Sequence, residues 1–165
     1  MSQQEQFWYR TLFRLKLLEA SGEAFQRLVG EVLEAEDPRF RLVAPWGRLG
    51  DKGNDGFIKE EGHYFQIYGP ERAEYNPVSA AKKAANDFAK LKASYTPARY
   101  TFVLNDRFRG IPEPVYRSLR EVESKFRVDC AALGARDLTE RFMRLPEEKR
   151  RDILCGIPGD GPGWV

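Results

Sequence analysis

The sequence predicts one α/β domain with a mixed central sheet that contains a β-hairpin and has helices on both faces. Two observations predict this fold: two short strand-like runs flank a turn near the middle of the chain, and strands then alternate with helical segments. At 165 residues the chain is long enough to bury one core. We assign residues 1–155 to this domain and residues 156–165 to an irregular tail.

Two helices are expected at the start of the chain. Residues 4–19 place apolar side chains at helical spacing, and Ser21 is a suitable N-cap for a second helix over 22–36. The residue before Pro38 is disfavoured in a helix, so the second helix should end there. Its expected buried stripe consists of Phe25, Leu28, Val29, Val32 and Leu33.

The next three elements are expected to be strands. Residues 39–44 alternate basic and apolar side chains, which is typical of a strand with one buried face. Residues 55–60 and 63–68 are rich in β-branched and aromatic residues, and Glu61-Gly62 between them resembles a two-residue hairpin turn. Side chains alternate along a strand, so Gln66 should share one face with Tyr64 and Tyr68.

The second half of the chain alternates helical and strand patterns. An apolar run at 99–104 is bounded by amphipathic segments, and Pro146 is well placed for the first turn of the last helix. The expected elements are a helix at 79–95, a strand at 99–104, a helix at 114–126, a strand at 127–131, and helices at 135–144 and 146–154.

Composition excludes several classes of protein. A hydrophobic content of 42% excludes a disordered chain, and a net charge of +2 means that any basic surface must be local. Two distant cysteines and one histidine argue against a disulfide framework and against a zinc site. The chain shows neither a secretion signal at its start nor an apolar run of membrane-spanning length, which favours the cytoplasm and no membrane partner.

The stretch from Gly50 to Glu71 contains the candidate site. It opens with Gly-Asp-Lys-Gly-Asn-Asp-Gly, in which glycines permit a tight turn and Asp51 and Asp55 supply carboxylates. Pairing across the hairpin should bring Asp55 near Gln66. A carboxylate and an amide beside a glycine turn are suited to a metal or phosphate site, although the same residues are also common in turns that only connect two strands.

Three segments resemble the PD-(D/E)xK, or restriction-endonuclease-like, superfamily, and the layout is nearest to its Mrr-like branch. They are GEAFQRLVGEVLE, FRLVAPWGRLGDKGNDGFI and YFQIYGPE, and the resemblance covers about residues 20–105. It implies a restriction-endonuclease-like fold in which Asp55 and Gln66 occupy metal-binding positions. It also implies Mg²⁺ or Mn²⁺ as the cofactor, which would activate water for phosphodiester hydrolysis.

Two positions depart from that motif. Tyr68 falls where the superfamily has a catalytic lysine, and Gln26 falls where a helix glutamate often joins the metal site. Lys59 has the same strand parity as Asp55 and is our candidate for the missing cation. The missing carboxylate has three candidates, which are Glu23, Glu31 and Asp51.

The expected site therefore has catalytic, metal-binding and nucleic-acid-binding parts. We assign catalysis to Asp55, Lys59, Gln66 and Tyr68, and metal binding to Asp51, Asp55 and Gln66. Basic residues near the turn are expected to contact phosphates; these are Arg41, Arg48 and Lys52. Four lysines further along the chain are more simply explained as a solvated helix face: Lys82, Lys83, Lys90 and Lys92.

Three functions stay open at this point. The first is a Mg²⁺-dependent endonuclease of a prokaryotic defence system, with DNA as the expected nucleic acid and RNA as the other. The second is a catalytically degenerate nuclease fold that binds nucleic acid without cutting it. The third is a module that binds a protein partner or a second copy of itself. Retention of Asp55 and Gln66 favours the first two functions, and loss of the lysine and the helix glutamate favours the last two.

Overall fold

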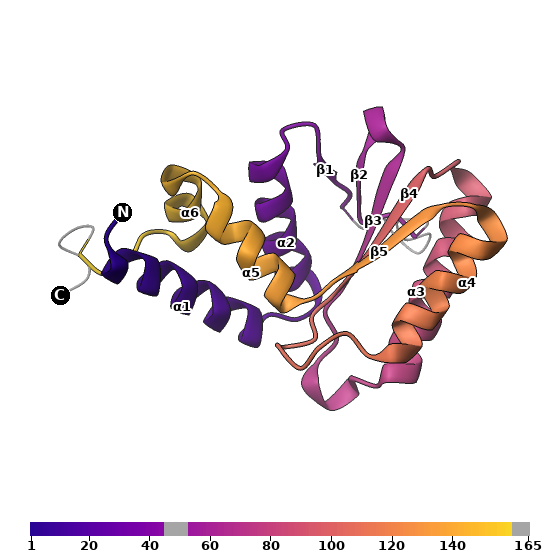
Figure 1. Ribbon diagram of the computed structural model, residues 1–165, viewed down its shortest axis with the longest axis horizontal. Coiled ribbons are helices and arrows are strands. Elements are labelled where there is room, and N and C mark those ends of the chain that lie inside the picture. The colour runs from indigo at the N-terminus through magenta and orange to yellow at the C-terminus, as the bar shows by residue number, and fades with distance from the viewer. Residues whose placement is uncertain (45–52, 160–165) are drawn as a thin grey trace.

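A computed structural model describes residues 1–44 and 53–159 and confirms the mixed α/β fold (Figure 1). Within these ranges there are six α-helices, two short 3-10 turns and one five-stranded sheet. The elements are α1 (Gln3–Glu19), α2 (Gly22–Glu36), β1 (Arg41–Leu42), β2 (Gly56–Ile58), η2 (Lys59–Glu61), β3 (His63–Tyr68), η3 (Arg72–Glu74), α3 (Pro77–Ser94), β4 (Arg99–Leu104), α4 (Glu113–Phe126), β5 (Asp129–Leu133), α5 (Ala135–Arg144) and α6 (Glu147–Leu154).

The sheet is mixed, and its strands lie in chain order from β1 to β5. β1 pairs with β2, and β2 with β3, in antiparallel fashion, whereas β4 lies parallel to both β3 and β5. The predicted hairpin is thereby confirmed, with Gly56 opposite Phe65. In addition, β3 and β4 end at the same edge of the sheet, because Tyr68 lies opposite Leu104.

The turn of the hairpin differs from the prediction. Ile58 is paired with His63, so four residues connect the strands instead of two. Lys59 to Glu61 form the 3-10 turn η2, and Gly62 closes it with a φ of +58°, which a glycine adopts without strain. The predicted two-residue turn is therefore wrong, and Lys59 lies in the turn and not in the strand.

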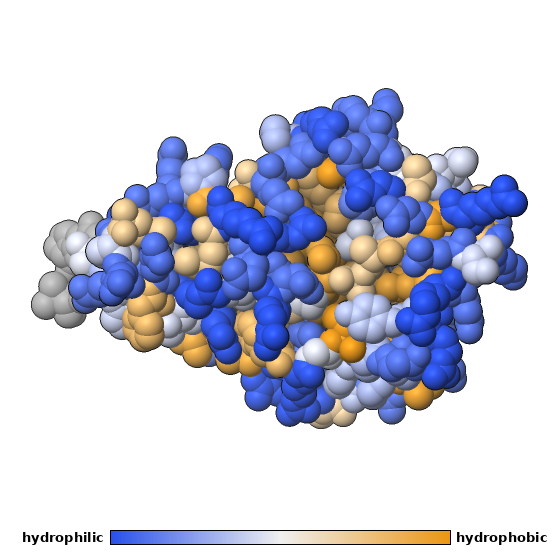
Figure 2. Space-filling model, in the orientation of Figure 1, coloured by the Kyte–Doolittle hydropathy of each residue, from blue (hydrophilic) through white to orange (hydrophobic). Residues whose placement is uncertain are grey.

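Helices cover both faces of the sheet, as predicted. One core contains residues of α1, α2, α5 and α6 together with Phe65, Ile67 and Val103, and the other joins α3 and α4 to Tyr100, Phe102 and Leu104. Figure 1 shows these two groups of helices on opposite sides of the strands. In Figure 2 hydrophilic side chains cover most of the same view, and hydrophobic ones show mainly between the two groups, over the sheet.

Several element ends differ from the predicted ones for local reasons. α3 begins at Pro77 because the Asn76 side chain accepts hydrogen bonds from the N–H groups of Val78 and Ser79. β5 begins only at Asp129 because Arg127, with a φ of +55°, ends α4 in the left-handed region. Ser21 does occupy the N-cap position of α2, but its hydroxyl donates to Glu71 at 2.7 Å and does not cap the helix. Pro146 precedes α6 as its N-cap residue.

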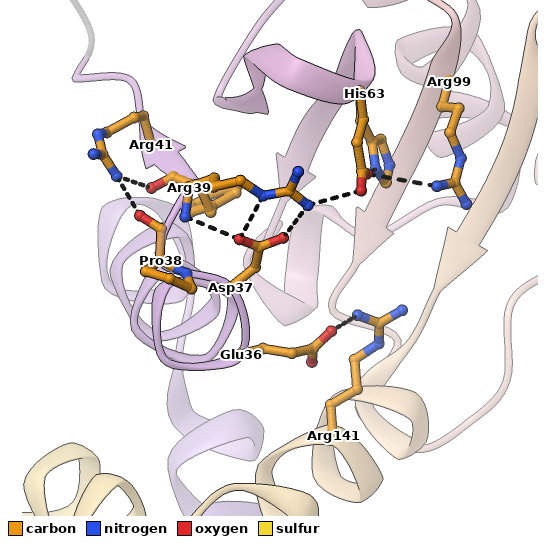
Figure 3. Close-up of polar contacts among 10 residues, drawn as sticks. Glu36, Asp37, Pro38, Arg39, Arg41, His63, Arg99 and Arg141 are labelled. Carbon is orange, nitrogen blue, oxygen red and sulfur yellow. Dashed lines mark hydrogen bonds and ion pairs between the residues drawn. The ribbon is translucent and has the colours of Figure 1, made fainter.

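A polar network ties the closed end of the hairpin to the helices (Figure 3). Arg39 donates to Asp37 at 2.8 Å and to Glu61 at 2.9 Å, and a separate pair joins Arg141 of α5 to Glu36 of α2 at 2.6 Å. These side chains are partly exposed, so solvent screens each pair and the pairs stabilise the fold only weakly. No helix within the described ranges has the length and apolar character needed to cross a membrane.

His63 gives the fold a pH dependence. Burial, followed by the charge of Arg99, lowers the pKa of its imidazole to about 4, and its Nε2 lies 2.7 Å from the Thr101 hydroxyl. Between pH 6.5 and 4 the imidazole of the unfolded chain therefore binds a proton, whereas that of the folded chain does not. The free energy of unfolding should consequently fall as the pH drops from 6.5 towards 4. We expect a loss of about 2 kcal/mol between pH 7.5 and 5, measured by urea unfolding.

The matched variant for this experiment is His63→Gln, which keeps a polar side chain beside Thr101 but does not titrate. Carboxylates also titrate near pH 5, and the variant retains all of them. An equal loss of stability in wild type and His63→Gln would show that His63 does not cause the pH dependence.

Candidate functional site

Asp55 lies immediately before β2 and is almost completely buried, with 1% of its surface exposed. Its backbone N–H donates to the Phe65 carbonyl at 2.9 Å, and its carbonyl accepts from the Val43 N–H at 2.8 Å. Its carboxylate oxygen Oδ2 accepts from the Ile67 N–H at 2.7 Å. The side chain is thus held against β3, the strand that pairs with β2 across the hairpin.

Gln66 lies on β3 and faces α3, because it shares its strand face with Tyr64 and Tyr68, which pack against the core on that side. It is 4% exposed, and its Oε1 atom is buried without a hydrogen-bond partner. Leaving a buried acceptor unsatisfied costs about 1–3 kcal/mol. A cation or a hydrogen-bond donor from a ligand would remove that cost.

Asp55 and Gln66 line one pocket of about 370 Å³ at the carboxyl end of β3. α2 contributes Gln26, and the segment after β3 contributes Pro70, Glu71 and Glu74. α3 closes the other side. The polar groups that it contributes are Lys83, Asp87 and Lys90.

Lys83 was expected on a solvated helix face, but it lines this pocket. Its Nζ lies 2.9 Å from Asp87 Oδ2 and 5.4 Å from the centre of the Tyr68 ring. Lys82 and Lys92 are exposed, as expected for a solvated face. The spacing Lys83, Asp87, Lys90 is i, i+4, i+7, which places all three on one helix face and was the signal available in the sequence.

Gly53 lies against α3 beside these residues. It has a φ of +79°, and a Cβ at this position would overlap the backbone carbonyl oxygen of Asp87. Only glycine permits both the conformation and the close approach. The next residue, Asn54, is 3% exposed, and its Oδ1 is buried without a hydrogen-bond partner. The contact between Gly53 and α3 therefore fixes the position of Asp55, two residues later, relative to that helix.

Other predicted site residues lie elsewhere. Lys59 is exposed in η2, at the other end of β2 from Asp55, and does not line the pocket. Arg41 donates to the carbonyls of Pro38 and Phe40 at 2.7 and 2.9 Å and does not line the pocket either. Tyr68 and Gln26 do line it.

The remaining candidates divide into two groups. Glu23 does not line the pocket, and Glu31 lines a different one together with Lys16 and Arg27. Three predicted residues lie outside the described ranges: Arg48, Asp51 and Lys52.

The described part of the pocket offers few metal ligands. No group of three His, Cys, Asp or Glu side chains within residues 1–44 and 53–159 is arranged to hold a metal ion. Asp55 supplies a carboxylate and Gln66 an unsatisfied amide oxygen. Mg²⁺ prefers oxygen ligands, keeps several waters, and is often held by one or two carboxylates together with substrate phosphates. These two side chains therefore fit a magnesium site that is completed by substrate.

Comparison with known protein families, curated proteins and solved structures finds no match to this chain. The site is thus interpreted from its own residues.

Proposed function

We propose that this domain has a restriction-endonuclease-like fold and hydrolyses phosphodiester bonds in nucleic acid with a divalent metal ion. The observation behind the proposal is the shared pocket of Asp55, Gln66 and Lys83, in which a buried carboxylate, an unsatisfied amide oxygen and an ammonium group meet. The order α2-β1-β2-β3-α3-β4 and the positions of Asp55 and Gln66 on the hairpin support it. DNA is the proposed substrate class, and a role in prokaryotic defence is its proposed setting.

Each side chain of the site has a proposed role. Asp55 and Gln66 would hold Mg²⁺ or Mn²⁺, which activates water and offsets charge on the phosphate when bound. Lys83 would stabilise the negative charge that develops on the phosphate, which is the role of the motif lysine. Tyr68 would position Lys83 through its ring.

A second function is favoured by the charges around Lys83. Asp87 already pairs with this lysine, and Glu71 and Glu74 place further negative charge around the same pocket. These carboxylates oppose the approach of a phosphate. They disfavour cleavage in this pocket, and so favour a degenerate nuclease fold that binds nucleic acid away from these carboxylates, a protein partner or a second copy without cutting.

A cleavage assay separates the two functions. Single- and double-stranded DNA and RNA are incubated with the protein and Mg²⁺, Mn²⁺ or EDTA, and products are resolved on a gel. Metal-dependent products support the hydrolase. Binding in a fluorescence anisotropy assay without products supports the degenerate fold. If the protein neither cuts nor binds nucleic acid, both the hydrolase and the nucleic-acid-binding function are wrong. A module that binds a protein partner or a second copy would then be the remaining function.

Lys83→Met should lower the cleavage rate about a hundredfold, because it removes the only ammonium group that approaches Tyr68 among the described residues. Lys82→Met is the matched control, since it removes the same charge from the neighbouring, exposed position of α3. Equal rates in the two variants would exclude Lys83 from the chemistry.

The double variant Lys83→Met with Tyr68→Lys should recover a large part of the lost rate. The double variant again has one ammonium group in the pocket, but this group now comes from residue 68 of β3 and not from residue 83 of α3. Tyr68→Lys alone should change the rate little, because Lys83 already supplies the charge. Single-turnover cleavage rates of the four proteins test this. A large gain from Tyr68→Lys alone would show that Lys83 does not replace the motif lysine.

A further inference from the structure

A second polar pocket, of about 160 Å³, lies at the same edge of the sheet as the carboxyl end of β4. Three arginines line it: Arg72 from the segment after β3, and Arg107 and Arg109 from the segment after β4. The two segments meet because β3 and β4 are parallel neighbours that end together. The phenol of Tyr75 also belongs to the lining. We call this group the arginine pocket.

The arginines of this pocket have no acidic partner within the described ranges. Within the described ranges, the side chains of Arg72 and Arg107 donate to backbone carbonyls: Arg72 to Leu18 at 3.2 Å, and Arg107 to Pro70 at 2.8 Å and Ala20 at 3.4 Å. The Nε atom of Arg107 is buried without a hydrogen bond. Burial, followed by the charge of Arg72, lowers the pKa of Arg107. Three guanidinium groups therefore repel one another in a space that an anion would neutralise.

Asp106, the acidic residue that lines the arginine pocket, is engaged elsewhere. Its Oδ1 accepts from the N–H of Phe108 at 3.1 Å and from the N–H of Ala135, the first residue of α5, at 2.9 Å. It is 6% exposed and forms no ion pair in the part of the chain that the structure describes. This carboxylate therefore holds the loop against α5, and its single negative charge does not balance the charges of three guanidinium groups.

The loop that presents Arg107 is held in an unusual conformation. Arg107 and Phe108 have φ values of +49° and +66°, in the left-handed region that side chains with a Cβ disfavour. Asn105 fixes the loop, since its amide donates to the carbonyls of Leu17 and Ala20 at 2.7 and 2.9 Å. Backbone strain that the surroundings maintain is typical of functional sites.

We propose that the arginine pocket binds a phosphate monoester group. Arginine presents a planar fork of donors that matches two phosphate oxygens, and three such guanidinium groups line the pocket against the single carboxylate of Asp106. The phosphate belongs either to a free nucleotide or to the phosphorylated end of a nucleic-acid strand. Phosphate binding at this site needs no metal and is independent of hydrolysis at Asp55. Pro70 is adjacent to both pockets, because its carbonyl accepts a hydrogen bond from Arg107 and it also lines the pocket of Asp55.

The first experiment measures binding of inorganic phosphate by calorimetry in EDTA at constant ionic strength. Arg72→Gln with Arg109→Gln removes two exposed guanidinium groups and keeps Arg107, whose hydrogen bonds support the loop. Arg117→Gln with Arg120→Gln removes two exposed arginines from α4 and is the control. We expect the first pair to raise the Kd for phosphate at least tenfold and the control pair to leave it unchanged.

Two results would overturn the proposal: absence of phosphate binding by the wild type, or equal weakening by both pairs of substitutions. Circular dichroism spectra and thermal midpoints equal to those of the wild type establish that the variants are folded. Asp55→Asn should bind phosphate as the wild type does, so that failure of the hydrolase proposal and failure of this one are distinguishable.

The second experiment identifies the source of the phosphate. A short oligonucleotide with a terminal phosphate, the same oligonucleotide with a terminal hydroxyl, and a nucleoside monophosphate are compared in EDTA. Tighter binding of the phosphorylated oligonucleotide than of both others, lost in Arg72→Gln with Arg109→Gln, assigns the strand end. Equal binding of the monophosphate and the phosphorylated oligonucleotide assigns a free nucleotide. Binding that is the same with either strand end and absent for the monophosphate overturns the proposal.

Discussion

Asp55→Asn should abolish metal-dependent cleavage and leave nucleic-acid binding intact. The substitution removes the buried carboxylate of the proposed metal site, while the amide oxygen still accepts from the Ile67 N–H, so the hairpin keeps its geometry. We expect the cleavage rate to fall by at least about a hundred- to a thousandfold, the range for loss of one group that stabilises the transition state. Affinity depends mainly on arginine and lysine contacts with phosphates and should survive.

The matched control is Asp137→Asn. Its carboxylate also accepts a backbone N–H, that of Gly134 at 2.8 Å, but it is exposed and does not line the pocket of Asp55. Cleavage rates are measured under single-turnover conditions, with affinity from fluorescence anisotropy in Ca²⁺. Cleavage by Asp55→Asn at the wild-type rate would remove Asp55 from the metal site.

Gly53→Ala should destabilise the fold by about 3 kcal/mol or more. A Cβ at this position combines a disfavoured backbone conformation, at a φ of +79°, with overlap of the Asp87 carbonyl oxygen. The left-handed region costs a residue with a Cβ about 1–2 kcal/mol, and overpacking against fixed backbone adds about 1–3 kcal/mol. Urea unfolding monitored by tryptophan fluorescence gives the change in the free energy of unfolding.

Gly110→Ala separates these two contributions. Gly110 has a φ of +99°, but no atom lies within 4 Å of its added Cβ, so only the conformational cost applies. We expect a loss of about 1–2 kcal/mol, clearly smaller than for Gly53→Ala. Equal losses of stability in the two variants would contradict the close contact between Gly53 and the Asp87 carbonyl of α3.

The fold was largely predictable because its signals are local. Alternation along 63–68, the apolar run at 99–104 and the apolar stripe of 22–36 identify elements that the structure confirms. The errors arose where one side chain or one backbone angle overrides the pattern. Asn76 caps α3, which therefore begins two residues before the predicted start, and the turn η2 removes Lys59 from the strand.

The candidate site was predictable only in part. Strand parity and hairpin pairing place Asp55 and Gln66 together, and the structure confirms that they share a pocket. Lys83 was missed because the i, i+4, i+7 spacing that it shares with Asp87 and Lys90 also fits a solvated face, and the sequence does not show how α3 lies on the sheet. The arginine pocket was missed for a similar reason, since Arg72 and Arg107 meet only through the parallel pairing of β3 and β4. The metal and nucleic-acid roles stay predictions.

The segment after β3 forms a wall common to both pockets. Pro70 and Glu71 line the pocket of Asp55, Arg72 and Tyr75 line the arginine pocket, and the Pro70 carbonyl receives the Arg107 guanidinium. A ligand that immobilises this wall from one pocket reduces the conformational entropy that is lost when a second ligand fills the other pocket. For the two ligands proposed above, thermodynamic linkage makes this effect mutual: phosphate would change the affinity for Mg²⁺ by the same factor as Mg²⁺ would change the affinity for phosphate.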